Sequence, residues 1–355
     1  MVIRRALAGL SLAELQNLLQ ALPAFRARQV FHWLARGVSS FEAMTDLAVP
    51  LRQDLANHFS LYSSIVSQRL EDSDGTVKLQ LSLQDHTRIE TVLLSDADGR
   101  KTACLSTQAG CPVACVFCKT GSLGFSRNLS SPEIVEQFLR LSSITDIANI
   151  VIMGMGEPLL NLDALCAALA VLTGDLGISR RRITISTSGI VEGIRELADK
   201  RLGTRLACSI TTADPALRER LMPIARANPL PRLHDALAYY QQEQGQRLTL
   251  EAVLLGNLNT RETDAAALGA FARGLDVVIN LIPWNPIPGL CFEGKPLREP
   301  SRWEVERFSA LLEHQGISIT RRFRKGVGIA GACGQLGFNP CAQMEHRAMV
   351  SDTTT

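Results

Sequence analysis

The chain has 355 residues, of which 46% are hydrophobic and 20% are charged, and its net charge is +2. This length suits one large α/β domain with a small appendage, and the apolar content is ample for a packed core. The balanced charge excludes a global basic field, so any contact with RNA must come from local patches. No apolar run approaches the roughly 18 residues of a membrane span, so no membrane partner is expected.

Residues 1–62 predict a small helical accessory domain that could bind RNA. Ser11 can cap a first helix, and Glu14 completes a capping box with it. Two further helices are expected near Phe25–Leu34 and Pro50–Phe59. The basic side chains of this domain form either a solvated surface or a surface that contacts RNA: Arg26, Arg28 and Arg36.

Residues 75–340 predict the main domain. Two β-rich runs, Val77–Leu83 and Arg88–Leu94, flank a polar stretch and indicate a β-hairpin. Strands then alternate with helices, which favours a parallel sheet in an open or partial barrel of the (βα)6 type. The expected strands are Thr102–Leu105, Ile147–Met153, Ile183–Thr187, Arg205–Ile210, Leu248–Leu254, Val277–Ile282 and Ile317–Phe323. The expected helices are Ser131–Leu141, Asp163–Leu172, Val191–Asp199, Pro215–Leu221, Leu230–Gln244, Thr263–Arg273 and Arg302–His314. Residues 341–355 are expected to form a flexible tail.

The most informative motif holds three cysteines at C-x3-C-x2-C spacing, Cys111, Cys115 and Cys118. Three neighbouring thiolates suit a soft metal. A [4Fe–4S] cluster needs four ligands, so three cysteines leave one iron open to S-adenosylmethionine (SAM), which is then cleaved to a radical. The motif resembles the signature of the radical-SAM superfamily. The alternatives are three buried thiols that act as small hydrophobes, or a zinc site completed by Cys104. Thiols at metal spacing also favour a reducing cytoplasm.

Polar residues follow the predicted strands at the edge where chemistry gathers in such folds. Gly156 lets the backbone approach a ligand, and Glu157 could hold the SAM ammonium, although both also suit an ordinary turn. The hydroxyls of Ser186, Ser209 and Thr211 end the next two strands. They could bind a ribose or a carboxylate, or they could cap helices.

The C-terminal part of the barrel carries three further candidates. Asn285 lies in a proline-rich loop, where it could pair with an adenine edge or form an Asx-turn. The basic run Arg321–Lys325 suits a phosphate backbone. The stretch Gly326–Gly331 matches G-x-G-x-x-G, but too few residues follow it for a dinucleotide-binding domain. The preferred interpretation is a flexible glycine loop that presents Cys333 as a nucleophile, and a structural cysteine is the alternative.

Over roughly residues 10–340 the chain resembles the RlmN/Cfr family of radical-SAM RNA adenine methyltransferases. The pieces that carry the resemblance follow one another in order. In the helical domain they are Phe25–Gln29 and Phe41–Thr45. In the main domain they are Arg88–Val92, Cys104–Ser106, Gly110–Cys118, Gly124–Leu129, Met153–Asn161, Ser186–Gly189, Asn280–Gly289 and Ala332–Leu336.

The resemblance implies a mechanism that uses two SAM molecules. One SAM methylates Cys333, and a second SAM at the cluster yields a 5′-deoxyadenosyl radical that takes a hydrogen from this methyl group. The resulting methylene radical adds to an sp² carbon of adenine, with C2 favoured. Cys104 then releases the adduct by forming a disulfide with Cys333, and Glu90 removes the ring proton. The SAM contacts implied are Gly156, Glu157, Ser186, Ser209, Thr211 and Asn285.

The implied partners are rRNA, possibly also tRNA, and an electron donor such as flavodoxin or ferredoxin, and the protein is expected to be a cytoplasmic monomer. The chain departs from the family pattern at Thr211, where histidine is usual, and at Lys119-Thr120, where Ser-Thr is usual. An acidic pair that commonly precedes the methyl-carrying cysteine is missing from Gly326–Gly331. The alternatives are a C8-directed, Cfr-like methyltransferase, a radical-SAM enzyme with another substrate, and a zinc-stabilised RNA-binding module without enzymatic activity.

Overall fold

The computed structural model describes residues 4–96, 98–321 and 324–337. A ten-stranded sheet in the order β16-β13-β12-β11-β10-β9-β6-β5-β4-β3 organises the main domain. Its strands from β6 to β16 are parallel, as the strand–helix alternation predicts. They are β6 (Lys101–Cys104), β9 (Asn149–Ile152), β10 (Ile183–Thr187), β11 (Arg205–Ser209), β12 (Leu248–Leu254), β13 (Val277–Pro283) and β16 (Ile319–Arg321). The predicted tail and the last two residues of the predicted strand Ile317–Phe323 lie outside the described residues.

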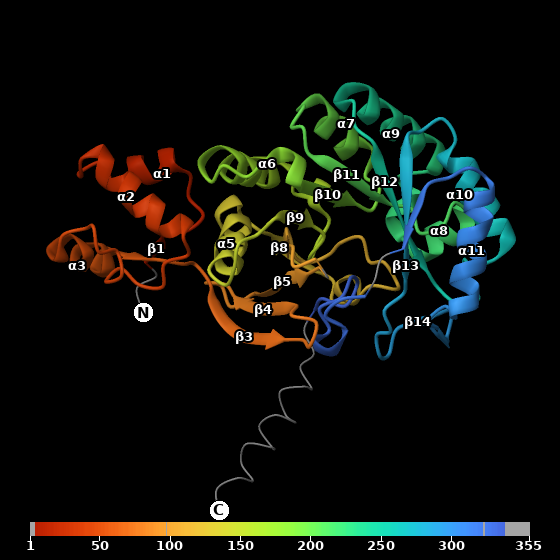
Figure 1. Ribbon diagram of the computed structural model, residues 1–355, viewed down its shortest axis with the longest axis horizontal. Coiled ribbons are helices and arrows are strands. Elements are labelled where there is room, and N and C mark those ends of the chain that lie inside the picture. Colours follow the sequence, from red (N-terminus) through yellow and green to blue (C-terminus); the bar gives the residue numbers. More distant parts are fainter. Residues whose placement is uncertain (1–3, 97, 322–323, 338–355) are drawn as a thin grey trace, which may run out of the picture.

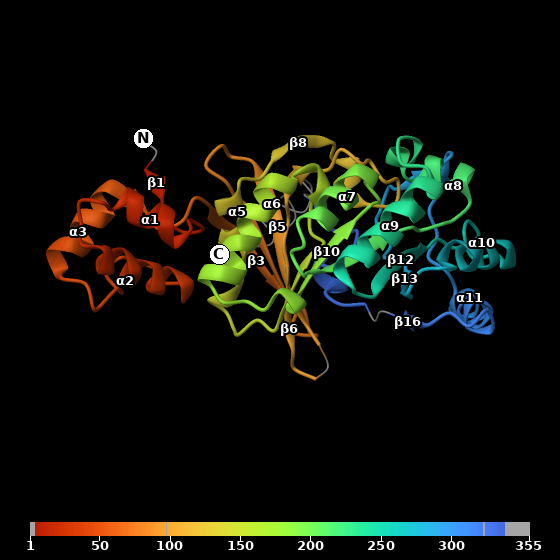
Figure 2. The same cartoon turned by 90° about the horizontal axis from the view of Figure 1, so that it is seen from above.

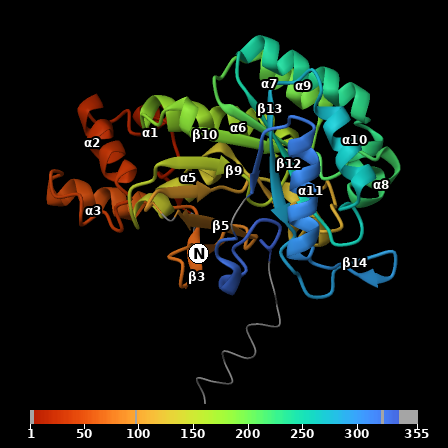
Figure 3. The same ribbon diagram turned by 45° about the vertical axis from the view of Figure 1, so that its right-hand side comes forward.

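Helices connect the parallel strands and cover the outside of the curved sheet, where Figure 3 shows α7, α9, α10 and α11. Ser130 and Ser301 begin α5 and α11 with complete capping boxes. The helices are α5 (Ser131–Ser142), α6 (Leu162–Ala170), α7 (Val191–Asp199), α8 (Pro215–Leu221), α9 (Leu230–Gln244), α10 (Glu262–Ala272) and α11 (Arg302–His314). The smaller elements are η1 (Pro158–Leu160), η2 (Val171–Asp175), η3 (Arg180–Arg182), η4 (Pro223–Arg226), β14 (Cys291–Phe292) and β15 (Lys295–Pro296). The prediction of an α/β fold with a partial barrel is confirmed.

An antiparallel extension continues the barrel sheet beyond β6. The predicted hairpin is confirmed as β4 (Val77–Ser82) and β5 (Arg88–Ser95), and β5 pairs with β6. A third strand, β3 (Ile65–Glu71), pairs with β4 and was not predicted. Most of its residues are exposed, so it lacks the alternation of apolar and polar residues that marks a half-buried strand. In Figure 1 the extension lies on the underside of the barrel, beside the C-terminal segment.

The N-terminal region forms a separate group of helices at one end of the molecule, next to α5 and α6 (Figures 1 and 2). Its helices are α1 (Leu12–Leu18), α2 (Ala24–Ala35) and α3 (Val49–His58), and β1 (Arg5–Ala6) pairs with β2 (Phe59–Ser60). The predicted capping box between Ser11 and Glu14 is present. Among the described residues no helix combines the length and apolar character needed to cross a bilayer.

Candidate active site

A cavity lies at the carboxyl edge of the parallel strands, with a free volume of about 1010 Å³ including its open mouth. Its walls come from the cysteine motif, from the segments that follow β9, β10 and β13, and from the C-terminal segment. Most of the predicted site residues line it: Cys111, Cys115, Cys118, Gly156, Glu157, Ser186, Ser209, Asn285 and Cys333. One sheet edge therefore brings together side chains that span more than half of the sequence.

The cysteine motif is held in place by backbone pairing. Strands β7 (Gln108–Gly110) and β8 (Phe125–Asn128) close the loop at its base, and Cys111 N–H donates to the Gly124 carbonyl over 2.9 Å. Gly110 has φ +76°, and a Cβ atom there would lie 1.9 Å from the Gly124 oxygen, so only glycine fits. On the other side, Val116 N–H donates to the Leu221 carbonyl of α8 over 3.0 Å.

The electrostatics of the three thiols fit a cationic metal centre. Burial raises the pKa of Cys111 to about 12 and raises the pKa of Cys115 and Cys118 as well. Neighbouring thiols and the Glu157 carboxylate raise the pKa of Cys111 and Cys115 further. Buried thiolates are stable only beside positive charge, and the three sulfurs suit iron. Within residues 4–96, 98–321 and 324–337, no group of three His, Cys, Asp or Glu side chains is already arranged around one metal position.

Glu157 joins the turn after β9 to the end of β10. Its carboxylate accepts the Ser188 N–H over 2.7 Å and the Leu159 N–H over 3.1 Å, and burial raises its pKa. Its own N–H donates to the Gln108 side chain over 2.8 Å. The preceding Gly156 has φ +102°, and a Cβ atom there would lie 2.5 Å from the Gln108 side chain. Glu157 therefore connects the segments that form this wall of the cavity.

Two buried polar atoms of the cavity wall have no hydrogen-bond partner in the described part of the chain, Ser188 Oγ and Asn285 Oδ1. Such atoms are costly unless a ligand satisfies them, so the wall fits a polar molecule such as SAM. Thr211 is different. It is buried, with φ +59° and an unsatisfied Oγ1, but it does not line the cavity. The structure does not bring this predicted contact to the site.

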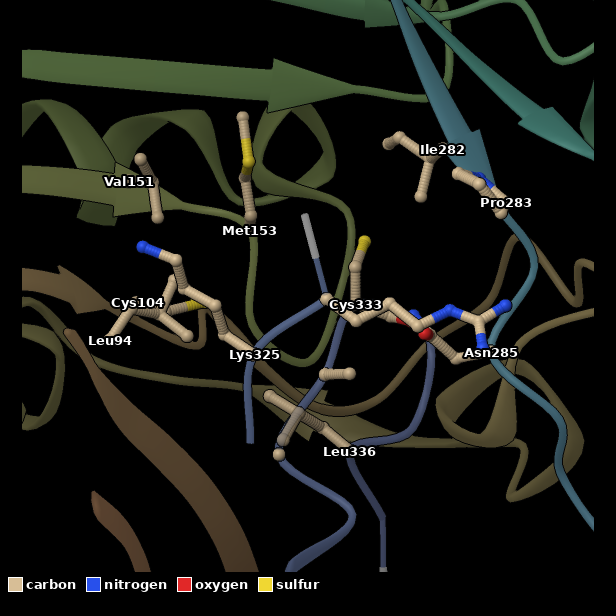
Figure 4. A pocket seen from close by; sticks show the side chains of 13 residues that line it. Leu94, Cys104, Val151, Met153, Ile282, Pro283, Asn285, Lys325, Cys333 and Leu336 are labelled. Atoms are coloured by element: carbon tan, nitrogen blue, oxygen red, sulfur yellow. The ribbon is translucent and has the colours of Figure 1, made fainter. Parts of the chain in front are cut away.

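Cys333 stands between this cavity and a second one. Figure 4 shows it between Cys104 and Lys325 on one side and Ile282 and Asn285 on the other. Cys104 lines only the second cavity, so it faces the space beside Cys333 rather than the three cysteines of the motif. This placement speaks against a zinc site completed by Cys104. The residues common to both cavities are Met153, Ile282, Asn285, Cys333 and Leu336.

Glu90, the predicted base, is buried in β5 and lines neither cavity. Its carboxylate forms an ion pair with Lys78 Nζ at 3.2 Å and accepts the Gly337 N–H over 2.8 Å. The structure therefore places Glu90 directly beside the C-terminal segment that carries Cys333. Access of this carboxylate to a substrate in the second cavity requires a local change of conformation.

The glycine-rich stretch before Cys333 is anchored to the turn between β3 and β4. Gly326 N–H donates to Asp74 and Gly328 N–H donates to Asp72, each over 2.9 Å. Residues Val327–Ile329 form the 3-10 helix η5. The stretch was predicted to be a flexible loop, but the two aspartates hold it. The sequence signal for this contact is the Asp72-Ser-Asp74-Gly turn, which sequence reasoning passed over.

The basic run before the glycine stretch is partly neutralised. Arg324 forms an ion pair with Glu299, and Lys325 forms one with Asp96. Arg321 is exposed at the end of β16, and Arg322 lies outside the described residues. Contact of Arg324 and Lys325 with a phosphate backbone would have to replace these ion pairs, and the role of the run in RNA binding stays a prediction.

In the helical domain, the predicted basic residues lie at the surface of α2. Arg28 lines a cleft between α2 and the barrel, opposite Asp146 and Asp175. Arg26 stacks over the exposed Phe25 ring, with its guanidinium carbon 4.7 Å from the ring centroid. A cation on an exposed aromatic ring can stack with an unpaired base.

Sequence reasoning missed Arg218, a buried arginine of α8. Its guanidinium donates to the Ser188 carbonyl over 2.8 Å and to the Ile210 carbonyl over 3.3 Å, so it joins the ends of β10 and β11. Its Nη1 has no hydrogen-bond partner among the described residues. An arginine in an amphipathic helix is usually exposed, and no sequence pattern marks this one as buried.

Comparison with known proteins agrees with this site. The Radical SAM superfamily model matches residues 105–268, and the model of the ribosomal RNA large subunit methyltransferase N-terminal domain matches residues 6–61. The probable dual-specificity RNA methyltransferase RlmN of Treponema pallidum (strain Nichols) is 49% identical over 94% of this chain and 97% of its own length. The protein of the same name from Thermus thermophilus is 38% identical over 91% of this chain and 94% of its own.

A solved structure supports the same assignment. The crystal structure of a radical SAM methyltransferase from Sphaerobacter thermophilus superposes with a TM-score of 0.87 and 39% identity, covering 94% of this chain and 99% of that one. The similarity includes both the helical domain and the barrel with its antiparallel extension. The chain therefore belongs to the RlmN family of radical-SAM RNA methyltransferases.

Proposed function

We propose that this protein methylates an sp² ring carbon of adenine, with C2 favoured, in rRNA and possibly in tRNA, through a methyl group carried by Cys333. The observation that carries the proposal is the position of Cys333. Its side chain lines both the cavity of the three-cysteine motif and the adjoining cavity that holds Cys104. One sulfur can thus receive a methyl group on one side and deliver it on the other.

Cys111, Cys115 and Cys118 would hold a [4Fe–4S] cluster through their thiolates. Gly156, Glu157, Ser186, Ser209 and Asn285 would surround SAM, and the unsatisfied oxygens of Ser188 and Asn285 would gain partners. When bound, the cluster supplies the electron that cleaves SAM reductively to a radical. Such radical chemistry is needed because an amidine-type ring carbon is too poor in electrons for ordinary methyl transfer.

Cys333 acts first as a nucleophile. Its thiolate attacks the sulfonium methyl group of SAM, a new S–C bond forms, and S-adenosylhomocysteine leaves with the electron pair of the broken bond. The thiol proton passes to solvent. The methyl group then lies between the two cavities, where an adenine in the second cavity can approach it. Because a base that is stacked in a duplex cannot enter a cavity, the adenine must come from unpaired or flipped RNA.

Cys104 and Glu90 complete the reaction. The radical drawn from SAM would take one hydrogen atom from the methyl group, the carbon would bond to the adenine ring, and the adduct would return the one electron that SAM cleavage used. Attack of the Cys104 thiolate on the Cys333 sulfur of this adduct forms an S–S bond, and the electron pair of the broken S–C bond stays on the released carbon, which takes a proton from solvent to become the new methyl group. Glu90 takes the ring proton once its hydrogen bond to Gly337 opens. An external thiol then reduces the disulfide. The electron donor is a flavodoxin- or ferredoxin-type protein, and the enzyme acts as a cytoplasmic monomer.

The proposal is tested by mass spectrometry of nucleosides from the rRNA and tRNA of a deletion strain. Loss of 2-methyladenosine, restored by the wild-type gene and not by Cys333→Ala, is the expected result. Loss of 8-methyladenosine instead would identify the C8-directed alternative. An unchanged nucleoside profile, together with intact SAM cleavage by the purified enzyme, would indicate a radical-SAM enzyme with another substrate.

A further inference from the structure

A buried ion pair holds the segment that carries Cys333. Lys78 of β4 and Glu90 of β5 have side chains that are only 7% and 4% exposed, and their charged atoms lie 3.2 Å apart. Lys78 Nζ also donates to the Ala330 carbonyl over 3.1 Å, and the second carboxylate oxygen of Glu90 accepts the Gly337 N–H over 2.8 Å. The ion pair therefore binds the backbone before Cys333, at Ala330, and after it, at Gly337.

Sheet stability alone does not explain this pair. Removing two charges from water is costly, and apolar residues of similar volume often stabilise a core as well or better. The extra hydrogen bonds of both partners go to the C-terminal segment rather than to the strands that carry them. The two charged groups fix the position of that segment. Hydrogen bonds to charged groups are stronger and more specific in direction than apolar contacts.

The segment that carries Cys333 is also held from its other sides. Asp72 and Asp74 bind Gly328 and Gly326, which precede the segment. On the barrel side, Asn285 Nδ2 donates to the Cys333 carbonyl over 2.9 Å and Thr120 Oγ1 donates to the Leu336 carbonyl over 2.6 Å. On the side of the antiparallel extension, Lys78 donates to the Ala330 carbonyl and Glu90 accepts the Gly337 N–H.

We propose that Lys78 is a positioning residue of the methyl transfer. Through Ala330, and through Glu90 and Gly337, it fixes residues 330–337 so that the Cys333 sulfur stays between the two cavities. It also ties the base to the segment that carries the nucleophile, so both groups depend on one ammonium. This inference rests on the proposed role of Cys333 as methyl carrier.

The test compares Lys78→Met and Lys78→Arg with Lys101→Met in the cluster-loaded, full-length enzyme. Lys101 of β6 is the control, because its ammonium donates to Ser95 Oγ at the end of β5 over 2.8 Å. Two rates are measured by mass spectrometry of the Cys333 peptide: methylation by SAM, and alkylation by iodoacetamide. Iron content and thermal unfolding are recorded for each variant.

Lys78→Met should slow methylation of Cys333 by at least about tenfold, since a displaced reacting atom is costly. It should also change the alkylation rate, because the exposed Cys333 loses its fixed surroundings when the segment is released. Lys78→Arg should recover part of the methylation rate, and Lys101→Met should match the wild type. The double variant Lys78→Met/Glu90→Gln removes the uncompensated charge, so it should regain thermal stability without regaining the methylation rate.

Methylation and alkylation rates of Lys78→Met that equal those of the wild type would overturn the inference. Recovery of methylation together with stability in the double variant would do the same, because the residue would then be merely structural. Failure of the proposed function looks different. In that case the wild-type Cys333 never gains a methyl group, while a changed alkylation rate in Lys78→Met would still support the positioning role.

Discussion

The side-chain amide of Asn285 donates a hydrogen bond of 2.9 Å to the backbone carbonyl of Cys333. Asn285 follows β13, whereas Cys333 lies in the C-terminal segment, so this bond fixes the segment against the carboxyl edge of the barrel. The Oδ1 atom of the same amide is buried in the cavity wall without a partner among the described residues. One side chain thus holds Cys333 in place and offers an acceptor to a ligand in the cavity.

Asn285→Ala should impair both roles. Loss of one hydrogen bond should lower the free energy of unfolding by about 1 kcal/mol. Loss of the Oδ1 acceptor should weaken SAM binding, measured by equilibrium dialysis. Asn285→Asp keeps an acceptor but loses the donor to Cys333, so it should bind SAM better than Asn285→Ala while still methylating Cys333 slowly. If Cys333 in Asn285→Ala is methylated at the wild-type rate, the hydrogen bond from Asn285 does not position Cys333.

Replacing Cys115 by alanine should abolish cluster loading. The remaining two thiols cannot hold a [4Fe–4S] cluster with one open iron, so iron content and SAM cleavage should both be lost. Cys166→Ala is the matched control, because this half-buried thiol of α6 lines neither cavity of the site. Iron and sulfide analysis with 5′-deoxyadenosine quantification decides the matter. Full iron content and normal cleavage in Cys115→Ala would show that the motif does not bind the cluster.

Cys104→Ala should trap protein on RNA. If Cys104 releases the adduct, its loss leaves RNA bonded to Cys333, and the complex should survive a denaturing gel. Cys291→Ala, which changes an exposed cysteine of β14, should leave no such band. A Cys104→Ala enzyme that turns over RNA normally would restrict this residue to a structural role in β6.

Glu304 should give the protein a measurable acid sensitivity. Desolvation raises the pKa of this carboxyl group, but hydrogen bonds from Ser301, Arg298 and Asn257 outweigh it and lower the pKa to about 2. Because the pKa in the folded state lies below the ordinary 4.5, the contribution to stability is complete above pH 4.5 and is lost as the pH falls towards about 2. The stability advantage of the wild type over Glu304→Gln, measured by urea unfolding, should therefore shrink across this range. An advantage that stays constant would show that these contacts do not lower the pKa.

The helices and strands of the barrel could be predicted because the signals that mark them lie within short stretches of sequence. Helices such as Val191–Asp199 and Leu230–Gln244 have the predicted bounds, since the spacing of apolar residues marks both and Gly245, in the left-handed conformation, ends the second. The cysteine motif could be recognised for the same reason, because its three thiols lie within eight residues. Its position beside Glu157 follows from the order of parallel strands.

Contacts between distant segments could not be predicted in this way. Lys78 and Ala330 are 252 residues apart, and no local pattern shows that a lysine on a strand is buried against that carbonyl. The hydrogen bonds that Gly328 and Gly326 donate to Asp72 and Asp74 also join segments that are far apart in the sequence, so no local pattern predicts them. Thr211 shows the opposite error, because a hydroxyl at a strand end was assigned to the cavity while its backbone at φ +59° places it elsewhere.

Transfer of a methyl group by way of Cys333 and a radical is tested most directly with SAM whose methyl group carries three deuterium atoms. The purified, cluster-loaded enzyme is incubated with this SAM, a reductant and an rRNA fragment, and nucleosides and 5′-deoxyadenosine are analysed by mass spectrometry. The proposed reaction removes one of the three deuterium atoms from the methyl group on Cys333. Methyladenosine with two deuterium atoms and 5′-deoxyadenosine with one are therefore expected. Methyladenosine that keeps all three deuterium atoms would show direct transfer and would contradict a radical route through Cys333.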